Sequence, residues 1–101
     1  MGDAARLDAL WVDRQRGIAG WGERVLPLTA QEVAVLIALA DADGRVVPRR
    51  ELARRAGIGQ QSSRRCDALL VGIRRALGDT AVRNVRSRGW ILTTALVDES
   101  S

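Results

Sequence analysis

The sequence has no histidine, phenylalanine or tyrosine, and it holds one cysteine among its 101 residues. Without histidine, the single thiol of Cys66 has no imidazole to activate it as a nucleophile, and a zinc site of clustered Cys and His cannot be built. One cysteine also cannot form an intrachain disulfide, so nothing points to an oxidising compartment. These absences predict a domain that is not an enzyme and that uses no metal or cofactor.

Long apolar runs are missing as well. The longest, from Val33 to Ala40, falls well short of the roughly 20 residues that a membrane-spanning helix needs. The N-terminus also lacks the apolar stretch of a signal peptide. We therefore expect a cytoplasmic chain without membrane contact. Its 47% hydrophobic and 28% charged residues are ordinary for one globular domain.

Lysine is absent too, so all 16 basic residues are arginine, and they are unevenly spread. Residues 45–88 hold 12 arginines against three acids, a local charge of +9, whereas residues 1–44 hold four against seven, or −3. A segregated basic half is typical of a protein that contacts phosphates, because each arginine near the DNA backbone releases condensed counterions. Charge alone leaves open both a nucleic-acid partner and a basic surface without one.

Residues 9–28 predict a small antiparallel sheet of short strands over 10–12, 18–19 and 25–28, separated by polar and glycine-rich turns. Pro27 cannot donate a ladder hydrogen bond, so the last of these strands is expected to be an edge strand or very short. Trp21, which lies between two glycines, is expected either to be exposed in a turn or to fold onto the sheet.

Three helices are predicted to follow. Thr29 and Glu32 have the spacing of a capping box at the start of the first, whose apolar residues recur at helical spacing, and Gly44 suits a left-handed end. The second runs from about Pro48 to Gly57, and its two arginine pairs are interpreted as phosphate contacts or as a solvated face. The third is capped by Ser62 or Ser63 and ends at Gly78.

The third helix has one apolar stripe, and this stripe includes the single cysteine: Cys66, Leu70, Ile73 and Leu77. With that stripe turned inward, a spacing of 100° per residue puts five residues outward: Arg64, Ala68, Val71, Gly72 and Arg75. After the helix, two strands over 82–85 and 90–93 are predicted to form a hairpin around residues 86–89, with Gly89 available for a positive φ. Residues 1–7 and 95–101 are expected to be flexible termini.

Four segments in this order resemble the C-terminal effector domain of OmpR/PhoB-type winged-helix transcriptional regulators of bacteria. They are LTAQEVAVLIAL at 28–39, GRVVPRREL at 44–52, RRCDALLVGIRRAL at 64–77 and VRNVRSRGWIL at 82–92. The resemblance covers residues 8–94 and implies an α+β winged helix-turn-helix domain. That fold has a four-stranded N-terminal sheet, three helices and a C-terminal hairpin wing, with the third helix in the major groove of double-stranded DNA and the wing in the minor groove.

The resemblance also implies which residues contact DNA. The family's basic or polar positions fall here on Arg64, Arg65, Arg74 and Arg86, with Arg75 and Arg88 as plausible additions. Arginine suits this role because its planar fork binds a phosphate or a guanine edge bidentately and enters a narrow minor groove. Pro48 stands where the family usually has a capping serine.

The centre of the third helix departs from the family, which usually carries polar or basic side chains there. Val71 and Gly72 occupy this region instead, as candidates for contact with a base or with another protein. Two functions follow: a DNA-binding regulator, with a homodimer on DNA as one arrangement, or a winged helix that binds RNA polymerase or another regulatory protein. The operator, the target genes and the activating signal are not encoded in any pattern of the sequence.

Overall fold

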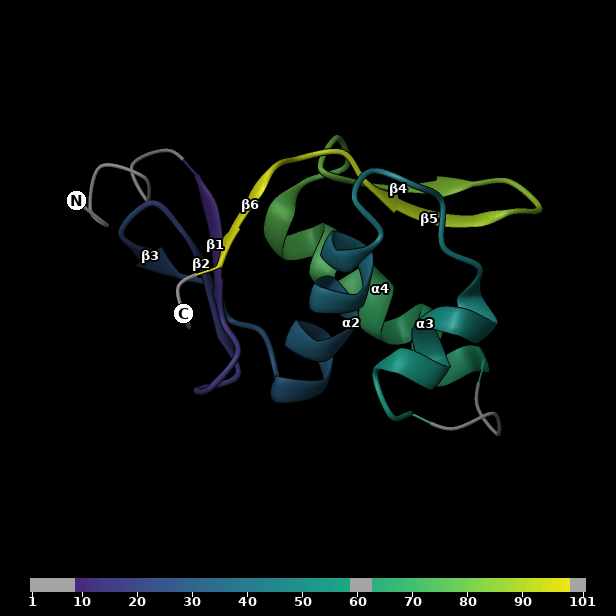
Figure 1. The fold of residues 1–101 in the computed structure, drawn as a ribbon, viewed down its shortest axis with the longest axis horizontal. Helices are drawn as coiled ribbons and strands as arrows, with labels where there is room; N and C mark the ends of the chain where they lie inside the picture. Colours follow the sequence, from purple (N-terminus) through teal and green to yellow (C-terminus); the bar gives the residue numbers. More distant parts are fainter. Residues whose placement is uncertain (1–8, 59–62, 99–101) are drawn as a thin grey trace.

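The computed structural model describes residues 9–58 and 63–98, which form an α+β domain (Figure 1). Within this part of the chain, three strands of a four-stranded sheet are followed by three helices, a two-stranded hairpin and the fourth strand of the sheet. The sheet lies at one end of the molecule and the tip of the hairpin at the other, with the helices between them (Figure 1). The predicted fold class and the predicted order of elements are therefore confirmed.

The four-stranded sheet has the order β3-β2-β1-β6. Its strands are β1 (Leu10–Asp13), β2 (Ile18–Trp21), β3 (Arg24–Val25) and β6 (Leu96–Asp98). Strands β1, β2 and β3 are antiparallel neighbours, as predicted, whereas β6 runs parallel to β1. Strand β3 lies at an edge and spans two residues, so the prediction of a very short edge strand before Pro27 is confirmed, although the expected span of 25–28 is wrong.

Strand β6 lies within residues 95–101, which were expected to be a flexible terminus. It pairs in register with β1, with Leu10 opposite Leu96 and Trp11 opposite Val97. That expectation is therefore wrong for residues 96–98, and the fourth strand comes from the C-terminal end of the chain. A strand of three residues carries too little periodicity to be recognised, and its partner lies far away in the sequence. The expectations for residues 1–7 and 99–101 fall outside the described residues.

Helix α2 (Ala30–Asp41) begins with the predicted capping box. The backbone amide of Glu32 donates to Thr29 Oγ1 at 3.1 Å, and the backbone amide of Thr29 donates to Glu32 Oε1 at 2.8 Å. The two bonds satisfy amides that the first turn of a helix otherwise leaves without partners. The helix ends at Asp41, and Asp43 and Gly44 both have positive φ values, of 54° and 80°.

The remaining elements are close to their predicted spans. They are α3 (Arg49–Arg55), α4 (Ser63–Leu77), β4 (Val82–Val85) and β5 (Gly89–Leu92). Pro48 precedes α3 in an extended conformation and makes no side-chain cap bond, so this helix begins without the bond that a serine can supply. Helix α4 begins at Ser63, which is therefore its first helical residue, and the other predicted capping residue, Ser62, lies outside the described residues.

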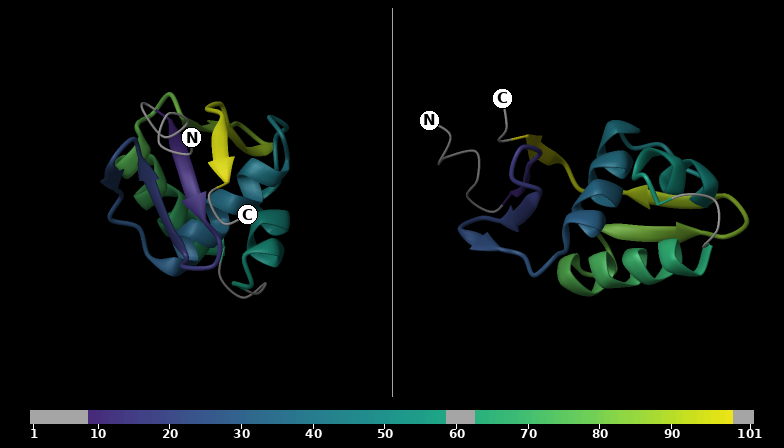
Figure 2. Two further views of the ribbon diagram at one scale, coloured as in Figure 1. Left: turned by 60° about the vertical axis from the view of Figure 1, so that its left-hand side comes forward. Right: turned by 90° about the horizontal axis from the view of Figure 1, so that it is seen from below.

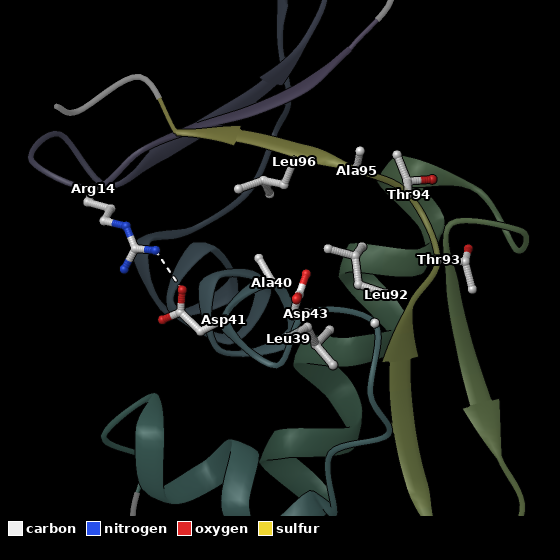
Figure 3. A pocket seen from close by; sticks show the side chains of 11 residues that line it. Arg14, Leu39, Ala40, Asp41, Asp43, Leu92, Thr93, Thr94, Ala95 and Leu96 are labelled. Carbon is white, nitrogen blue, oxygen red and sulfur yellow. Dashed lines mark hydrogen bonds and ion pairs between the residues drawn. The ribbon is translucent and has the colours of Figure 1, made fainter.

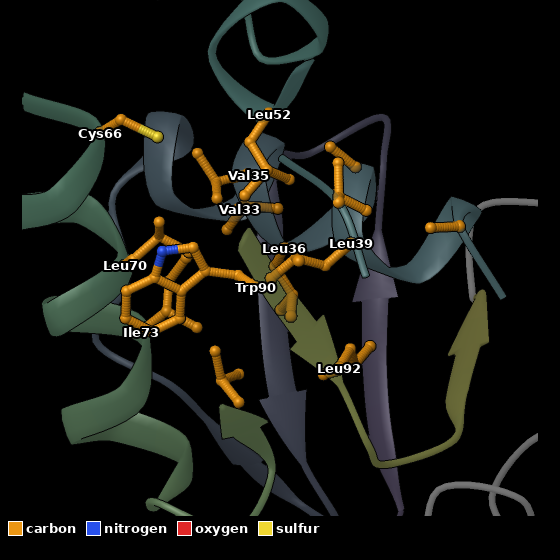
Figure 4. Close-up of a cluster of buried hydrophobic side chains, with 14 of the residues drawn as sticks. Val33, Val35, Leu36, Leu39, Leu52, Cys66, Leu70, Ile73, Trp90 and Leu92 are labelled. Atoms are coloured by element: carbon orange, nitrogen blue, oxygen red, sulfur yellow. The ribbon is translucent and has the colours of Figure 1, made fainter. Parts of the chain in front are cut away.

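The core lies where α2 meets the other elements (Figure 4). Helix α2 contributes Val33, Val35, Leu36 and Leu39, against which Leu70 of α4 packs within the same cluster. Trp90 and Leu92 bring the hairpin into this cluster, and Leu10 and Val12 bring in the sheet. Among the described residues no charged or polar side chain is buried. None of the helices in that part of the chain is long and apolar enough to cross a membrane.

Trp11 of β1 contacts the neighbouring strand β2 and the turn after it. Only 2% of this residue is exposed, and its indole Nε1 donates to the carbonyl oxygen of Gly22 at 2.8 Å. The ring lies so close to Gly20 that a Cβ at that position would be 2.1 Å from Cζ2 of the ring. Trp21, at the end of β2, is half-buried and packs against the core. It lies on the sheet and not in an exposed turn.

Candidate nucleic-acid interface

Helix α4 is amphipathic in the direction that the sequence predicts. Cys66, Leu70 and Ile73 are fully buried, and Leu77 packs against the core as a half-buried residue. The opposite face is solvent-exposed, with Arg64, Ala68, Val71 and Arg75 spaced at i, i+4, i+7 and i+11. Val71 is 43% exposed and is one of two large hydrophobic residues that the described chain leaves exposed. The outward face therefore has arginine at both ends and aliphatic side chains between them.

The four arginines predicted on α4 do not have the same surroundings. Arg64 and Arg75 are exposed and form no ion pair with any described residue. Arg65 is also exposed, and its guanidinium donates to the side-chain oxygen of Gln31 on α2. Arg64 and Arg75 are thus the arginines of this helix that are best placed to meet an external phosphate.

Arg74 is held against the molecule. Its guanidinium carbon lies 5.7 Å from the ring centroid of Trp90, and its Nε lies 3.5 Å from Asp79 Oδ1. A cation over an indole face is attracted by the ring quadrupole. Arg74 therefore holds α4 against Trp90 of strand β5, and the structure places it apart from the outward face.

Gly72 does not lie on the open outward face where the helical projection placed it. A Cβ there would come within 2.0 Å of Glu32 Oε2, the carboxylate whose other oxygen completes the capping box of α2. The absence of a side chain at residue 72 leaves room for the Glu32 carboxylate at the start of α2. Gly72 is thus a contact between two helices of the same chain.

The β4–β5 hairpin forms the predicted wing and carries two exposed arginines at its tip. Val85 pairs with Gly89, so residues 86–88 form the loop, closed by a bond from the backbone amide of Arg88 to the oxygen of Val85 at 2.9 Å. Ser87 has a positive φ of 66°. Arg86 and Arg88 on either side of it are exposed and have no ion-pair partner in the described chain.

The wing is anchored by backbone contacts to strand β5, next to the wing loop. Val47, which precedes α3, exchanges two hydrogen bonds with Trp90 of β5, at 2.8 and 2.9 Å. Gly89 has a φ of 145°, and a Cβ there would lie 2.1 Å from the oxygen of Val47. The predicted positive φ of Gly89 is confirmed, and glycine is required both for this backbone conformation and for the close approach of Val47.

The start of α4, which carries Arg64 and Arg65, and the tip of the wing, which carries Arg86 and Arg88, lie at the same end of the molecule. Figure 2 (right) shows α4 running alongside the hairpin, with the start of the helix and the tip of the hairpin both directed away from the β1–β2–β3 sheet. Between them lies a hollow of about 470 Å³ to which Arg88, Asn84 and Trp90 contribute. Its floor includes the ion pair between Arg49 Nη1 and Asp67 Oδ2, at 2.8 Å.

Three of the four arginines in the pairs of α3 form ion pairs within the chain. Arg54 and Arg55 both bind the carboxylate of Glu51, and these bonds lower the pKa of Glu51. Arg49 is paired with Asp67, as described above, which leaves Arg50 as the exposed arginine of this helix without an ion pair to the described residues. Of the two interpretations of these pairs, the contacts favour a solvated helix face.

One exposed arginine of the wing, Arg83, was not predicted from the sequence. Arg83 lies on β4 beside the buried Val82 and has no ion pair with any described residue. The pattern Val82-Arg83-Asn84-Val85 contains the signal, because alternation along a strand turns the side chain that follows a buried valine outward. Arg83 extends the basic surface from the tip of the wing along its strand.

A second hollow, of about 450 Å³, lies between the end of α2 and the segment that leads to β6 (Figure 3). Leucine side chains from α2, β5 and β6 line it together with Thr93, Thr94 and Asp43. Its lining also includes an ion pair of 2.7 Å between Arg14 and Asp41, drawn as a dashed line in Figure 3. Both charged groups of that pair are thus engaged with each other.

Cys66 is buried at the contact between α3 and α4, and its sulfur lies 3.9 Å from the carbonyl oxygen of Arg49. Burial, followed by the nearby charge of Asp67, raises the pKa of the thiol. The prediction of a buried cysteine is confirmed. No group of three or more histidine, cysteine or acidic side chains in the described chain is arranged to hold a metal ion.

The fold is shared with solved DNA-binding domains. The DNA-binding domain of CpxR from E. coli is 26% identical, with 90% of this chain covering 93% of that one at a TM-score of 0.72. The DNA-binding domain of the response regulator AdeR, solved in complex with an intercistronic region, is 21% identical, with coverages of 84% and 94% and a TM-score of 0.74. The E. coli CadC domain is 19% identical, with coverages of 88% and 90% and a TM-score of 0.75.

No protein-family model matches the sequence, and no curated protein matches it. The structural likeness nevertheless confirms the fold that the four sequence segments predict. The chain has the winged-helix fold of OmpR/PhoB-type DNA-binding domains.

Proposed function

We propose that this chain is the DNA-binding domain of a transcriptional regulator, with α4 in the major groove and the wing in an adjacent minor groove. The observation that carries the proposal is the common direction of the start of α4 and the tip of the wing (Figure 2). Arg64, Arg86 and Arg88 lie there exposed and without ion pairs to described residues. Guanidinium groups in that state are available to neutralise phosphates.

Each element has a separate role in this proposal. Arg64 and Arg75 hold phosphates or guanine edges at the two ends of α4, and Arg65 does so from the side of the helix that faces Gln31. Arg86 and Arg88 enter the minor groove, whose narrow A·T-rich stretches attract arginine. Arg74 supports the wing through Trp90. Because bacterial chromosomal DNA lies in the cytoplasm, the proposal places the chain there.

The structural comparison supports the coarse form of this proposal. The compared structures are DNA-binding domains, and one of them is described as bound to an intercistronic region. The folding unit that we propose spans residues 8–98, because β6 completes the sheet beyond the boundary at residue 94 that the sequence indicates.

The test is a titration with duplex DNA of unrelated sequence at two salt concentrations. Phosphate binding predicts that the affinity falls steeply as salt rises, because each contact releases counterions. Binding that is absent at low salt, or that does not change with salt, contradicts the proposal.

A second function rests on the exposed Val71. Its position in the middle of the outward face, 43% exposed, suits an apolar contact with RNA polymerase or another regulatory protein. Such a contact responds weakly to salt, since little charge is buried in it. The same titration, made with the candidate protein in place of DNA, separates the two functions.

A further inference from the structure

The outward face of α4 differs in chemistry between its ends and its centre. Arg64 and Arg75 are eleven residues apart, which is about three helical turns, so they point in nearly the same direction. At 1.5 Å of rise per residue, their Cα atoms are separated by about 16 Å along the axis. The major groove of B-DNA is about 12 Å wide. Two long side chains at this separation can therefore reach the sugar–phosphate walls on both sides of the groove.

The centre of this face has no polar side chain to present to the bases. Ala68 and Val71 lie about 6 Å and about 10 Å along the axis from Arg64, within the span between the two arginines. Both are exposed, and neither can donate or accept a hydrogen bond. Gly72 beside them is turned to Glu32 and contributes no side chain. Neither side chain at the centre of the face can pair with the donors and acceptors of a base edge.

The major groove contains one apolar feature on a normal base, the C5-methyl group of thymine. We infer that the Ala68–Val71 face of α4 reads thymine methyl groups, while Arg64 and Arg75 fix the helix on the two backbones. This inference rests on the proposed function and adds to it the chemical class of base contact. The short aliphatic side chains also let the helix backbone approach the groove floor closely, which a methyl contact requires.

The inference is tested by adding and removing that methyl group without changing charge or base pairing. The probes are an alternating adenine–thymine duplex and the same duplex with uracil at every thymine. A second pair is an alternating guanine–cytosine duplex with and without 5-methylation of every cytosine, which puts a methyl group at the same edge of the groove. Binding is measured by fluorescence anisotropy at one low salt concentration.

We expect the methylated member of each pair to bind about fourfold more tightly for each methyl group contacted, the factor that corresponds to burying one methyl(ene) group. In Val71→Ala this ratio falls toward one. The matched control is Val25→Ala, because Val25 is the other exposed large hydrophobic residue and lies on β3, at the far end of the molecule. The control keeps the wild-type ratio. Alanine is a strong helix former, so Val71→Ala is expected to keep the melting temperature of the wild type.

Other outcomes overturn the inference in distinguishable ways. Equal affinity of the wild type for both members of each pair, with normal salt dependence, refutes methyl recognition and leaves the proposed function standing. An equal loss of affinity for all four duplexes in Val71→Ala shows that the side chain acts without regard to the methyl group, which also refutes it. Absence of salt-dependent binding to any of the duplexes refutes the proposed function and the inference together.

Discussion

Removing the two guanidinium groups of the wing tip should reduce the salt dependence of DNA binding by a calculable amount. Each phosphate that a protein neutralises contributes about −0.9 to the slope of log affinity against log salt concentration. If Arg86 and Arg88 each neutralise one phosphate, the double variant Arg86→Ala/Arg88→Ala has a slope shallower by about 1.8. Between 50 and 200 mM salt, a fourfold change, the variant should then lose about twelvefold less affinity than the wild type.

The assay is fluorescence anisotropy of a labelled duplex of unrelated sequence at four salt concentrations. The matched control is Arg16→Ala/Arg24→Ala, which removes the same charge from exposed arginines of the sheet end. Nε of Arg16 lies 3.8 Å from Oδ2 of Asp13, and 77% of the Arg16 side chain is exposed, so removing this side chain should disturb the fold little. Equal slopes in the wing variant and the wild type would show that the wing tip neutralises no phosphate. Equal changes in both double variants would show that net charge, and not the wing, governs binding.

Three further predictions concern the packing of the domain that positions α4 and the wing. The first two are checked by urea unfolding and the third by thiol titration. Thr29→Ala removes one bond of the capping box and should lower the free energy of unfolding by about 1 kcal/mol; an unchanged value would contradict a stabilising cap. Gly20→Ala puts a methyl group 2.1 Å from the Trp11 ring and should cost about 1–3 kcal/mol, whereas a neutral substitution would mean that the ring moves freely. Because burial raises the pKa of Cys66 and hides its sulfur, a disulfide reagent at pH 8 should react slowly with the native chain and rapidly in urea; rapid native reaction would contradict its burial.

Local sequence patterns were enough to predict the capping box of α2, the buried face of α4 and the β4–β5 hairpin. The capping box needs two residues three positions apart, and Thr29 and Glu32 form it as their spacing indicates. The buried stripe of α4 follows from helical periodicity, and Cys66, Leu70 and Ile73 are fully buried. The hairpin follows from two apolar runs around Gly89. In each case the pattern that predicts the structure lies within one short segment of the sequence.

The features that could not be predicted depend on contacts between distant segments. Strand β6 is fixed by pairing with β1, whose residues are more than 80 positions earlier in the sequence. The helical projection gave Gly72 an outward position, but it could not show that Glu32 of α2 occupies the space beside it. Likewise, the sequence predicts Arg74 as a surface arginine and does not show that the ring of Trp90 packs against it. Periodicity gives the direction of a side chain and not the identity of its neighbour.

The distribution of charge on this domain also bears on how selective its DNA binding can be. A bidentate bond between a side chain and a base edge contributes about 1–3 kcal/mol of discrimination, and the centre of α4 offers no group that forms one. A methyl contact through Val71 gives less, about 0.8 kcal/mol for one buried group. The exposed arginines at the ends of α4 and at the wing tip meanwhile raise affinity for every sequence alike when they bind phosphates. A single copy with this surface should therefore have appreciable affinity for any DNA and only a small difference in affinity between sequences. Further selection then comes from arginines that bind guanine edges or respond to minor-groove width, or from a second copy bound alongside, since discrimination at well-separated positions adds.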